Sequence, residues 1–308
     1  MIDIRIPLFG AALAALTGSC IADPAPGQAQ AAKQGKPAGT PVAKKTPTRI
    51  GKFALDRAPE QGGLLYGFAP AGTRRLTVDN TVVEIAPDGL FLAGFGRDYG
   101  PFVTISATLA TGGTVVERLP VRKRAWRLEN IKTLPKYQQP SEEFQRRRPP
   151  ELAQINAARH MVTGAQGWRQ TFIWPARGRF SGFFGSQRIY AGEPGSPHSG
   201  VDVAGGAGAP VVAPADGVVI LAAESPFTLE GNLLMIDHGA GLSTAFLHLS
   251  RIDVHRGDVV RQGQLVGAIG MTGRATGPHL HWALRWYEQK VDPQVFAGPM
   301  PVGPLRPL

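Results

Sequence analysis

The sequence predicts a mainly β protein in which a small β-sandwich-like domain and a short helical connector precede a second, C-terminal domain of antiparallel β-sheet. Between residues 49 and 128, and again between 171 and 299, short β-rich runs are separated by glycine, proline and aspartate turns. Helical spacing of apolar residues occurs only in the connector, residues 129–170. A hydrophobic content of 43% over 308 residues is enough for a substantial core.

The first 22 residues are typical of a secretory signal peptide. They contain one early cation, Arg5, then an apolar run from Ile6 to Leu16, then small residues that end at Ala22. The apolar run is too short for a transmembrane helix, which needs roughly 18 to 20 residues, and no later segment reaches that length. We therefore expect an exported protein of the periplasm or cell envelope, with no transmembrane span after cleavage.

Cys20 is the only cysteine, so the chain has no intramolecular disulfide. Its place at the end of the leader raises lipid attachment as an alternative to cleavage after Ala22. Cleavage with loss of Cys20 is favoured, because Leu16 lies one position too far from the cysteine for the usual bacterial lipobox. An anchor through Cys20 stays open as the alternative.

Residues 23–48 are rich in alanine, proline, glutamine, lysine and glycine. This composition lacks the apolar side chains that offset the entropy of ordering, so it predicts a disordered linker. The linker contributes to the formal net charge of +10, which favours polyanionic partners. A cell-wall polymer or anionic lipid is a better candidate than nucleic acid, since no basic motif interleaved with aromatic residues is present.

The first β domain, residues 49–128, has strand-like runs about ten residues apart, which predicts a small antiparallel sandwich or barrel. Its "GFGRDYG" stretch resembles a nucleotide-binding loop, but no helical pattern follows it, so a plain turn is the better interpretation.

The connector contains a predicted helix. Ser141 before two glutamates is a suitable N-cap, and the helical pattern restarts after Pro149 and Pro150. Three apolar residues recur near helical spacing and predict a face that packs on a domain: Leu152, Ile155 and Val162. The run Arg146 to Arg148 is interpreted as a solvated face.

Six of the seven histidines fall in the C-terminal β domain: His198, His238, His248, His255, His279 and His281. A catalytic zinc site commonly takes three protein ligands from histidine, aspartate or glutamate and leaves one position to water. His198, Asp202 and one of His279 and His281 meet that count. The sequence therefore predicts a zinc site in this domain.

The "HLH" spacing separates the roles of two histidines. In a strand, His279 and His281 lie on one face, about 7 Å apart along the chain. That distance is too long for both to crowd one ion, but it suits one ligand and one residue that addresses the water. In "HSGVD" a bend is needed to bring His198 and Asp202 together, and Gly200 allows it.

The remaining histidines have simpler interpretations. His238, beside a glycine-rich turn, is expected to be structural, His255 to be exposed, and His160 in the connector to lie on the surface.

Several long segments of the second β domain closely resemble the LytM/lysostaphin-type zinc metallopeptidases, which cut peptide bonds in bacterial peptidoglycan. The resemblance covers about Phe180 to Pro293 and includes "HSGVDVAGGAGAPVVAPADGVV", "GNLLMIDHGAGLSTAFLHLS" and "GDVVRQGQLVGAIGMTGRATGPHLHWAL". It implies an antiparallel β fold for the domain at 171–299, which a tail at 300–308 follows.

The resemblance also implies the roles of individual residues. His198, Asp202 and His281 would bind one zinc ion, whereas His279 and His248 would be catalytic. His279 would address the water or the developing oxyanion, and His248 would be its partner. Glutamate is a weaker candidate for the base, because the chain has no HExxH motif and only scattered glutamates in this domain: Glu193, Glu224 and Glu230.

Together these observations predict a zinc-dependent endopeptidase that hydrolyses stem or cross-bridge peptides of peptidoglycan during cell-wall remodelling. The alternative is a non-catalytic wall-binding protein that activates another peptidoglycan hydrolase. A biotinyl or lipoyl carrier is disfavoured, because no lysine stands between the two hairpins that look like those of such carriers. Peptidoglycan is the expected partner, and a regulatory protein partner stays open.

Overall fold

The computed structural model describes residues 48–132, 141–305 and 307. The predicted leader and linker lie outside the described residues, except for Thr48, where the first strand begins. The described part is mainly β with antiparallel sheets, as the sequence predicts. None of its helices is both long and apolar enough to cross a membrane.

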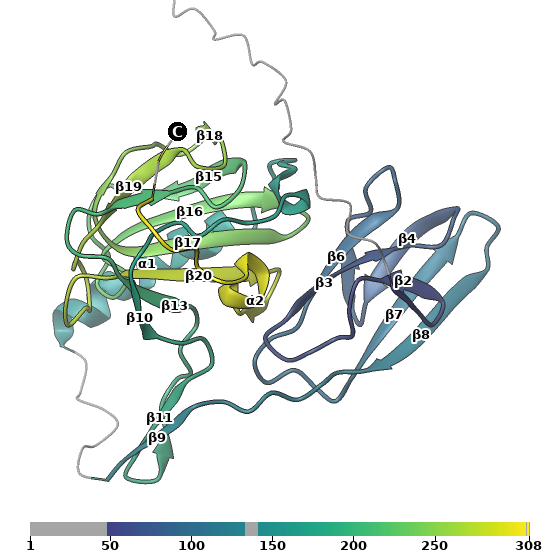
Figure 1. The fold of residues 1–308 in the computed structure, drawn as a ribbon, viewed down its shortest axis with the longest axis horizontal. Coiled ribbons are helices and arrows are strands. Elements are labelled where there is room, and N and C mark those ends of the chain that lie inside the picture. The colour runs from purple at the N-terminus through teal and green to yellow at the C-terminus, as the bar shows by residue number, and fades with distance from the viewer. Residues whose placement is uncertain (1–47, 133–140, 306, 308) are drawn as a thin grey trace, which may run out of the picture. The chain divides into compact units, whose positions relative to one another are not determined.

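Two four-stranded antiparallel sheets form the first β region (Figure 1). One has the order β1 (Thr48–Ile50), β2 (Phe53–Leu55), β3 (Leu64–Phe68) and β6 (Leu90–Gly94). The other has the order β5 (Thr81–Val83), β4 (Thr73–Val78), β7 (Phe102–Leu109) and β8 (Thr114–Pro120). Burial of one face of each strand holds such a sheet in place. In β7 the alternate residues Val103, Ile105 and Ala107 are fully buried.

A small three-stranded sheet corrects the prediction for the connector. Strand β9 (Leu128–Ile131) pairs in parallel with β11 (Gln187–Tyr190), which pairs with β12 (Glu193–Pro194). The start of the segment predicted as a helical connector is therefore a strand. The partner strand lies almost 60 residues away in the sequence, so a local pattern could not show the pairing.

The largest sheet carries the predicted site. Its main path is β10 (Arg179–Gly182), β13 (Val201–Ala204), β20 (Leu280–Trp286), β17 (Leu242–Ile252), β16 (Asn232–Gly239), β15 (Gly217–Ala222) and β18 (Val259–Val260). Off this path, β14 (Pro210–Val212) pairs with β19 (Leu265–Ile269), β19 pairs with β17, and β21 (Gln289–Val291) pairs with β20. One face packs on a core that includes Trp168, Trp174 and Trp282, all of them fully buried or nearly so.

Two short helical segments flank this sheet. A 3-10 turn, η1, spans Gly167–Arg169, and α2 spans Pro293–Ala297. The Asp292 side chain caps α2 by accepting a hydrogen bond from the Gln294 amide. No helix or strand occurs among the described residues after 299.

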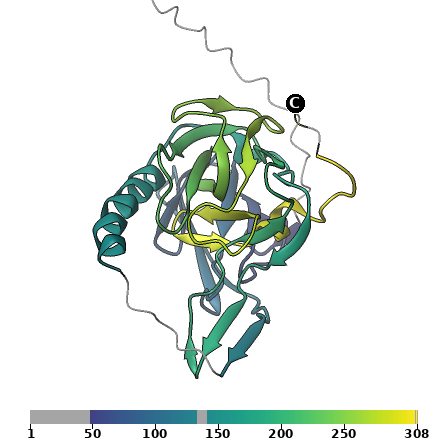
Figure 2. The same ribbon diagram turned by 90° about the vertical axis from the view of Figure 1, so that its left-hand side faces the viewer.

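Helix α1 (Glu142–Arg159) packs on the other face of the large sheet (Figure 2). Ser141 is its N-cap, as predicted, and its side chain accepts a hydrogen bond from the Phe144 amide. The predicted restart after Pro149 is wrong, because the helix runs through both prolines. The predicted buried face is also shifted: Ile155 is buried, but Leu152 is 39% exposed and Val162 is 90% exposed.

The arginine run of α1 is not a solvated face throughout. The guanidinium of Arg148 lies 2.6 and 2.9 Å from the two carboxylate oxygens of Glu230, and only 15% of its side chain is exposed. Glu151 is buried and accepts hydrogen bonds from the amide and hydroxyl of Thr228. The missed signal is that Glu151, on the helix, and Glu230, in the turn before β16, are counter-charges for Arg148.

The first β region contacts the connector through Tyr66 and the C-terminal domain through Arg124. The Tyr66 hydroxyl donates to the Trp168 carbonyl at 2.5 Å, and the two rings stack with centroids 6.3 Å apart. The guanidinium of Arg124 lies 2.9 Å from the carboxylate of Asp292. One hydrophobic core includes residues of both β regions.

Candidate metal and catalytic site

Neighbouring strands bring the three predicted ligands together. Strand β13 pairs with β20 so that Asp202 lies directly opposite His281. His198 stands just before β13, and its Nε2 lies 3.1 Å from Oδ2 of Asp202. Nδ1 of His281 lies 2.8 Å from Oδ1 of the same carboxylate. The ligand atoms of the three residues all lie within 4.8 Å of one another.

Two glycines make this close approach possible. A Cβ atom at Gly182 would lie 2.1 Å from Oδ2 of Asp202, and one at Gly200 would lie 2.3 Å from the Trp282 carbonyl oxygen and 2.9 Å from Nε2 of His281. Gly200 therefore serves close packing of the backbone in addition to the predicted bend. Gly182 was not predicted from the sequence, although it lies within the span from Phe180 to Pro293 that carries the resemblance.

His279 lies beside the three predicted ligands, but its ring nitrogens are not among the donor atoms that lie within 4.8 Å of one another. Its Nε2 is 3.8 Å from Oδ1 of Asp202, which is a longer separation than that of either neighbour. Trp282 points to the opposite face and packs edge-on against Trp174, with ring centroids 5.3 Å apart. The alternation predicted for this strand is therefore confirmed.

A β-bulge brings His248 to the site. Phe246 pairs with Trp282 and Leu247 with His281, so regular alternation would place His248 on the core face, with Trp282. The register against β16 gains one residue between Phe246 and Leu249, and His248 has a φ of 65°. A non-glycine residue in this region is uncommon, and such strain clusters at functional sites. The ring of His248 consequently lies 4.9 Å from that of His279, centroid to centroid.

Backbone carbonyls fix which imidazole nitrogen carries the proton. Nδ1 of His248 lies 2.8 Å from the Thr272 carbonyl oxygen, and Nδ1 of His279 lies 2.8 Å from that of Gly277. A carbonyl only accepts, so both Nδ1 atoms donate. Each histidine thus keeps Nε2 for chemistry at the site. Nδ1 of His198 is tied in the same way to the Phe183 carbonyl at 3.2 Å, which leaves Nε2 for a metal.

The electrostatics of the cluster favour a bound cation. Burial by itself raises the pKa of Asp202, but hydrogen bonds with His198 and His281 outweigh burial and lower the pKa below the usual aspartate value. Burial lowers the pKa of His281, although Asp202 acts in the opposite direction. For His198 burial also opposes the charged form, but the hydrogen bond and charge of Asp202 prevail and raise its pKa. The result is an ionised carboxylate between two imidazoles.

This set of residues fits a zinc ion. Two imidazoles and one carboxylate are a usual ligand set for catalytic zinc, which leaves one position open. The donor atoms already face one another, with Nδ1 of His281 and Nε2 of His198 lying 2.8 and 3.1 Å from the two carboxylate oxygens of Asp202.

The other histidines lie outside the site, as predicted. His238 is fully buried, and its Nδ1 and Nε2 lie 2.7 Å from the Asp216 carbonyl oxygen and 3.0 Å from the Thr244 hydroxyl. His160 and His255 are exposed.

The glutamates considered as weaker candidates are also accounted for. Glu193 and Glu224 are exposed, and the carboxylate of Glu230 is occupied by Arg148. The backbone carbonyl of Glu230 accepts a hydrogen bond from the His248 amide at 2.8 Å, and so helps to hold the bulge.

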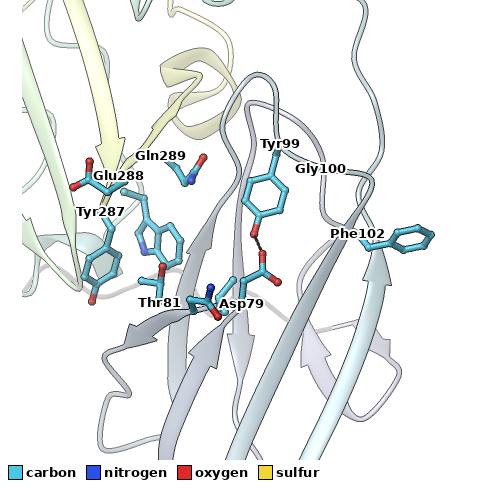
Figure 3. Close-up of a pocket in the computed structure, with 11 residues that line it drawn as sticks. Asp79, Thr81, Tyr99, Gly100, Phe102, Tyr287, Glu288 and Gln289 are labelled. Carbon is cyan, nitrogen blue, oxygen red and sulfur yellow. Dashed lines mark hydrogen bonds between the residues drawn. The ribbon is translucent and has the colours of Figure 1, made fainter.

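A cavity of about 500 Å³ opens beside the ligands. His198 and Ser199 line it on one side, and the loop at residues 96–100 and the turn at 288–290 line it on the other. A second cavity of about 300 Å³ shares Tyr99 and Glu288 with the first (Figure 3). In it the Tyr99 hydroxyl donates to Asp79, and no histidine lines it, so it lies outside the reaction centre.

The comparison with protein families agrees with the geometry. Residues 196–293 match Peptidase family M23. The chain is 46% identical to peptidoglycan DD-endopeptidase ShyA from Vibrio cholerae over 89 residues. These residues make up 29% of this chain and 20% of ShyA. It is also 42% identical to DD-carboxypeptidase/endopeptidase Mpg from Neisseria meningitidis over 104 residues. These residues make up 34% of this chain and 24% of Mpg. The matches thus span about a fifth to a quarter of these relatives.

A solved structure extends the likeness beyond this segment. A crystal structure from Pseudomonas aeruginosa described as an M23 peptidase superposes with a TM-score of 0.63 at 29% sequence identity. The superposition covers 79% of this chain and 96% of that one, so it includes much more than residues 196–293. The predicted resemblance to LytM/lysostaphin-type peptidases is confirmed for the C-terminal region, in which residues 196–293 match Peptidase family M23.

Proposed function

We propose that this protein is a zinc-dependent endopeptidase that hydrolyses peptide bonds in the stem or cross-bridge peptides of peptidoglycan. The observation that carries the proposal is the joint arrangement of a three-residue ligand set and a separate histidine pair on one face of the sheet. Of the curated relatives, ShyA is named a peptidoglycan DD-endopeptidase and Mpg a DD-carboxypeptidase/endopeptidase, which supports the proposal. Such a substrate places the protein in the periplasm or cell envelope.

In this proposal His198, Asp202 and His281 hold zinc. Zinc, when bound, supplies a Lewis acid that polarises a carbonyl and activates water at neutral pH. The Phe183 carbonyl orients His198 through Nδ1, and the short distances from Asp202 to Nε2 of His198 and Nδ1 of His281 show that the three donor groups converge on one point.

His248 and His279 carry the proton chemistry in the proposal. Burial lowers the pKa of His248, so its imidazole is neutral at pH 7 and its Nε2 can accept a proton. His279, with Nδ1 held by the Gly277 carbonyl, presents its own Nε2 to the reacting carbonyl and the leaving amine. Once an Nε2 has accepted a proton it carries an N–H, which can donate a hydrogen bond to the carbonyl oxygen as negative charge develops and then pass the proton to the leaving amine.

The non-catalytic alternative explains less of this arrangement. A structural zinc site is usually closed by four protein ligands and needs no adjacent acid–base pair. Here the ligand group has three residues, and the strained bulge at His248 serves only to bring a fourth imidazole near without adding it to the ligand group.

The test is mass spectrometry of purified peptidoglycan after digestion. The zinc-loaded protein should release muropeptides in which one defined peptide bond has been cut. Asp202→Ala should reduce this release by at least about 1,000-fold, because it removes a ligand and the charge between two imidazoles. The matched control is Asp253→Ala, which removes a carboxylate that pairs with Arg251 in the same domain. Equal release by Asp202→Ala and the wild type would contradict the proposal.

A further inference from the structure

The β20–β21 hairpin places cations on the same face of the sheet as the ligand His281. Arg285 follows His281 by four residues in a strand with continuous register, so the two side chains share a face, about 13 Å apart along the strand. Lys290 lies directly opposite Arg285 across the hairpin and therefore points to the same face. Lys290 also lines the cavity that His198 lines.

The two carboxylates in the wall of this cavity are already paired. Asp98 lies 2.5 Å from the guanidinium of Arg97, and Glu288 accepts a hydrogen bond from Arg285. Lys290 has no ion pair among the residues that the structure describes, and it is exposed, so a ligand can reach it. Its ammonium is thus the cation of the cavity that lacks a counter-charge.

The surroundings of Lys290 favour an anion. Partial burial lowers the pKa of Lys290, and the positive charges of Arg159 and Arg285 lower it further. Burial together with Arg285 likewise lowers the pKa of Arg159, at the end of α1. A bound anion would relieve the repulsion among these three cations.

We propose that Lys290 binds a carboxylate of the peptide substrate in the cavity between the ligand His198 and the loop at residues 96–100. This inference rests on the proposed function, because it identifies the substrate as an acidic peptide. About 13 Å along an extended chain corresponds to about four residues, so the carboxylate belongs to a residue within that distance of the bond that is cut. Arg285 has a positioning role, because it donates a hydrogen bond to the Glu288 carboxylate and so keeps that carboxylate from pairing with the Lys290 ammonium.

The loop at residues 96–100 completes the subsite from the first β region. Arg97 donates hydrogen bonds to the Gly185 carbonyl at 2.8 Å and to the Gln187 side chain at 2.9 Å. The Gly96 amide donates to the side chain of Gln289, next to Lys290, at 3.0 Å. These bonds hold the loop against the C-terminal domain, so both β regions contribute to recognition of the substrate.

The experiment measures binding of a crosslinked muropeptide to the full-length protein without zinc, so that no bond is cut. The same muropeptide with its free carboxylates converted to amides is the second ligand. The wild type should bind the free acid about 10-fold more tightly than the amide. Lys290→Met, which keeps the apolar stem and removes the charge, should bind both ligands alike, with the affinity that the wild type has for the amide. Lys123→Met, which removes an exposed lysine outside the cavity, should behave as the wild type.

The outcomes separate this inference from the proposed function. Equal affinity of the wild type for the acid and the amide, or a preserved preference in Lys290→Met, would overturn the carboxylate subsite. Cleavage of the free-acid muropeptide by the zinc-loaded wild type is measured in parallel. A failure there, with the binding preference intact, would contradict the proposed function and leave the subsite supported.

Discussion

His238 shows how strongly the local environment decides the role of a histidine. It lies in the same domain as the ligands, but it is fully buried and its two ring nitrogens have partners in the Asp216 carbonyl and the Thr244 hydroxyl. Burial lowers its pKa to about 4, from an ordinary value of 6.5, although nearby acceptors and acids oppose the shift. A buried imidazole with two such partners stabilises the fold only while it is neutral.

This shift predicts a pH dependence of stability. The unfolded chain binds a proton at His238 below pH 6.5, whereas the folded chain does so only near pH 4. The stability is therefore complete above pH 6.5 and falls as the pH drops toward 4, by about 3 kcal/mol in total. Chemical denaturation of the wild type and His238→Gln across this range checks it. The free energy of unfolding of His238→Gln should fall less steeply between pH 6.5 and 4, and parallel curves would contradict the assignment.

The candidate ligands stand out by residue type and spacing, but the geometry around them could not be derived in full. Strand alternation places His279 and His281 on one face and correctly turns Trp282 to the core, whereas the choice of His281 as the ligand came from the resemblance to a known family. For His248 the same rule gives the wrong face, since a bulge with a φ of 65° reverses it. Only the resemblance to a known family identified His248, because a bulge depends on the pairing of strands that lie far apart in the sequence.

At the scale of elements, strand β10 supports the ligands through a residue that has no side chain. Gly182 faces Asp202, and a Cβ atom there would lie 2.1 Å from Oδ2 and 3.0 Å from Cε1 of His198. Such a contact forces the carboxylate to move, whereas the pairing of β10 with β13 can persist.

Gly182→Ala should therefore weaken zinc binding without unfolding the protein. Mutation of a residue that supports a metal ligand typically lowers the metal affinity by about 10- to 100-fold. Competition with a chromophoric chelator measures the zinc affinity, and the thermal unfolding midpoint serves as a check on folding. Gly113→Ala is the matched control, since the added Cβ would meet only Thr111, at 3.8 Å. An unchanged zinc affinity in Gly182→Ala would contradict the role given to β10.

Helix α1 shows where local patterns reach their limit. Its N-cap at Ser141 depends on neighbours within one turn and was predicted correctly. Its buried face was predicted only in part: Ile155 is buried, but Glu151 is also drawn inward by Thr228 and Arg148 by Glu230, both from the turn before β16. The spacing of apolar residues gives no information on such buried polar contacts, so the sequence pattern favoured Leu152 and Val162, which are exposed.

At the scale of the whole molecule, the mainly β class and the location of the site were predictable, whereas the interplay of the two β regions was not. Turn residues every ten positions indicate strands, but they do not give the parallel pairing of β9 with β11 or the contact of Tyr66 with Trp168. Nor does composition show that the loop at residues 96–100 lines a cavity with His198. These features arise from contacts between residues that are distant in the sequence.

The central claim is that two histidines separated by one residue have different functions, with His281 as a metal ligand and His279 as a catalytic residue. The most direct measurement is the zinc content of His279→Ala and His281→Ala, set beside their cleavage of peptidoglycan. We predict that His279→Ala retains one zinc ion per chain and loses cleavage by at least about 100-fold, whereas His281→Ala loses both. Loss of zinc from His279→Ala, with zinc retained and cleavage intact in His281→Ala, would contradict the account.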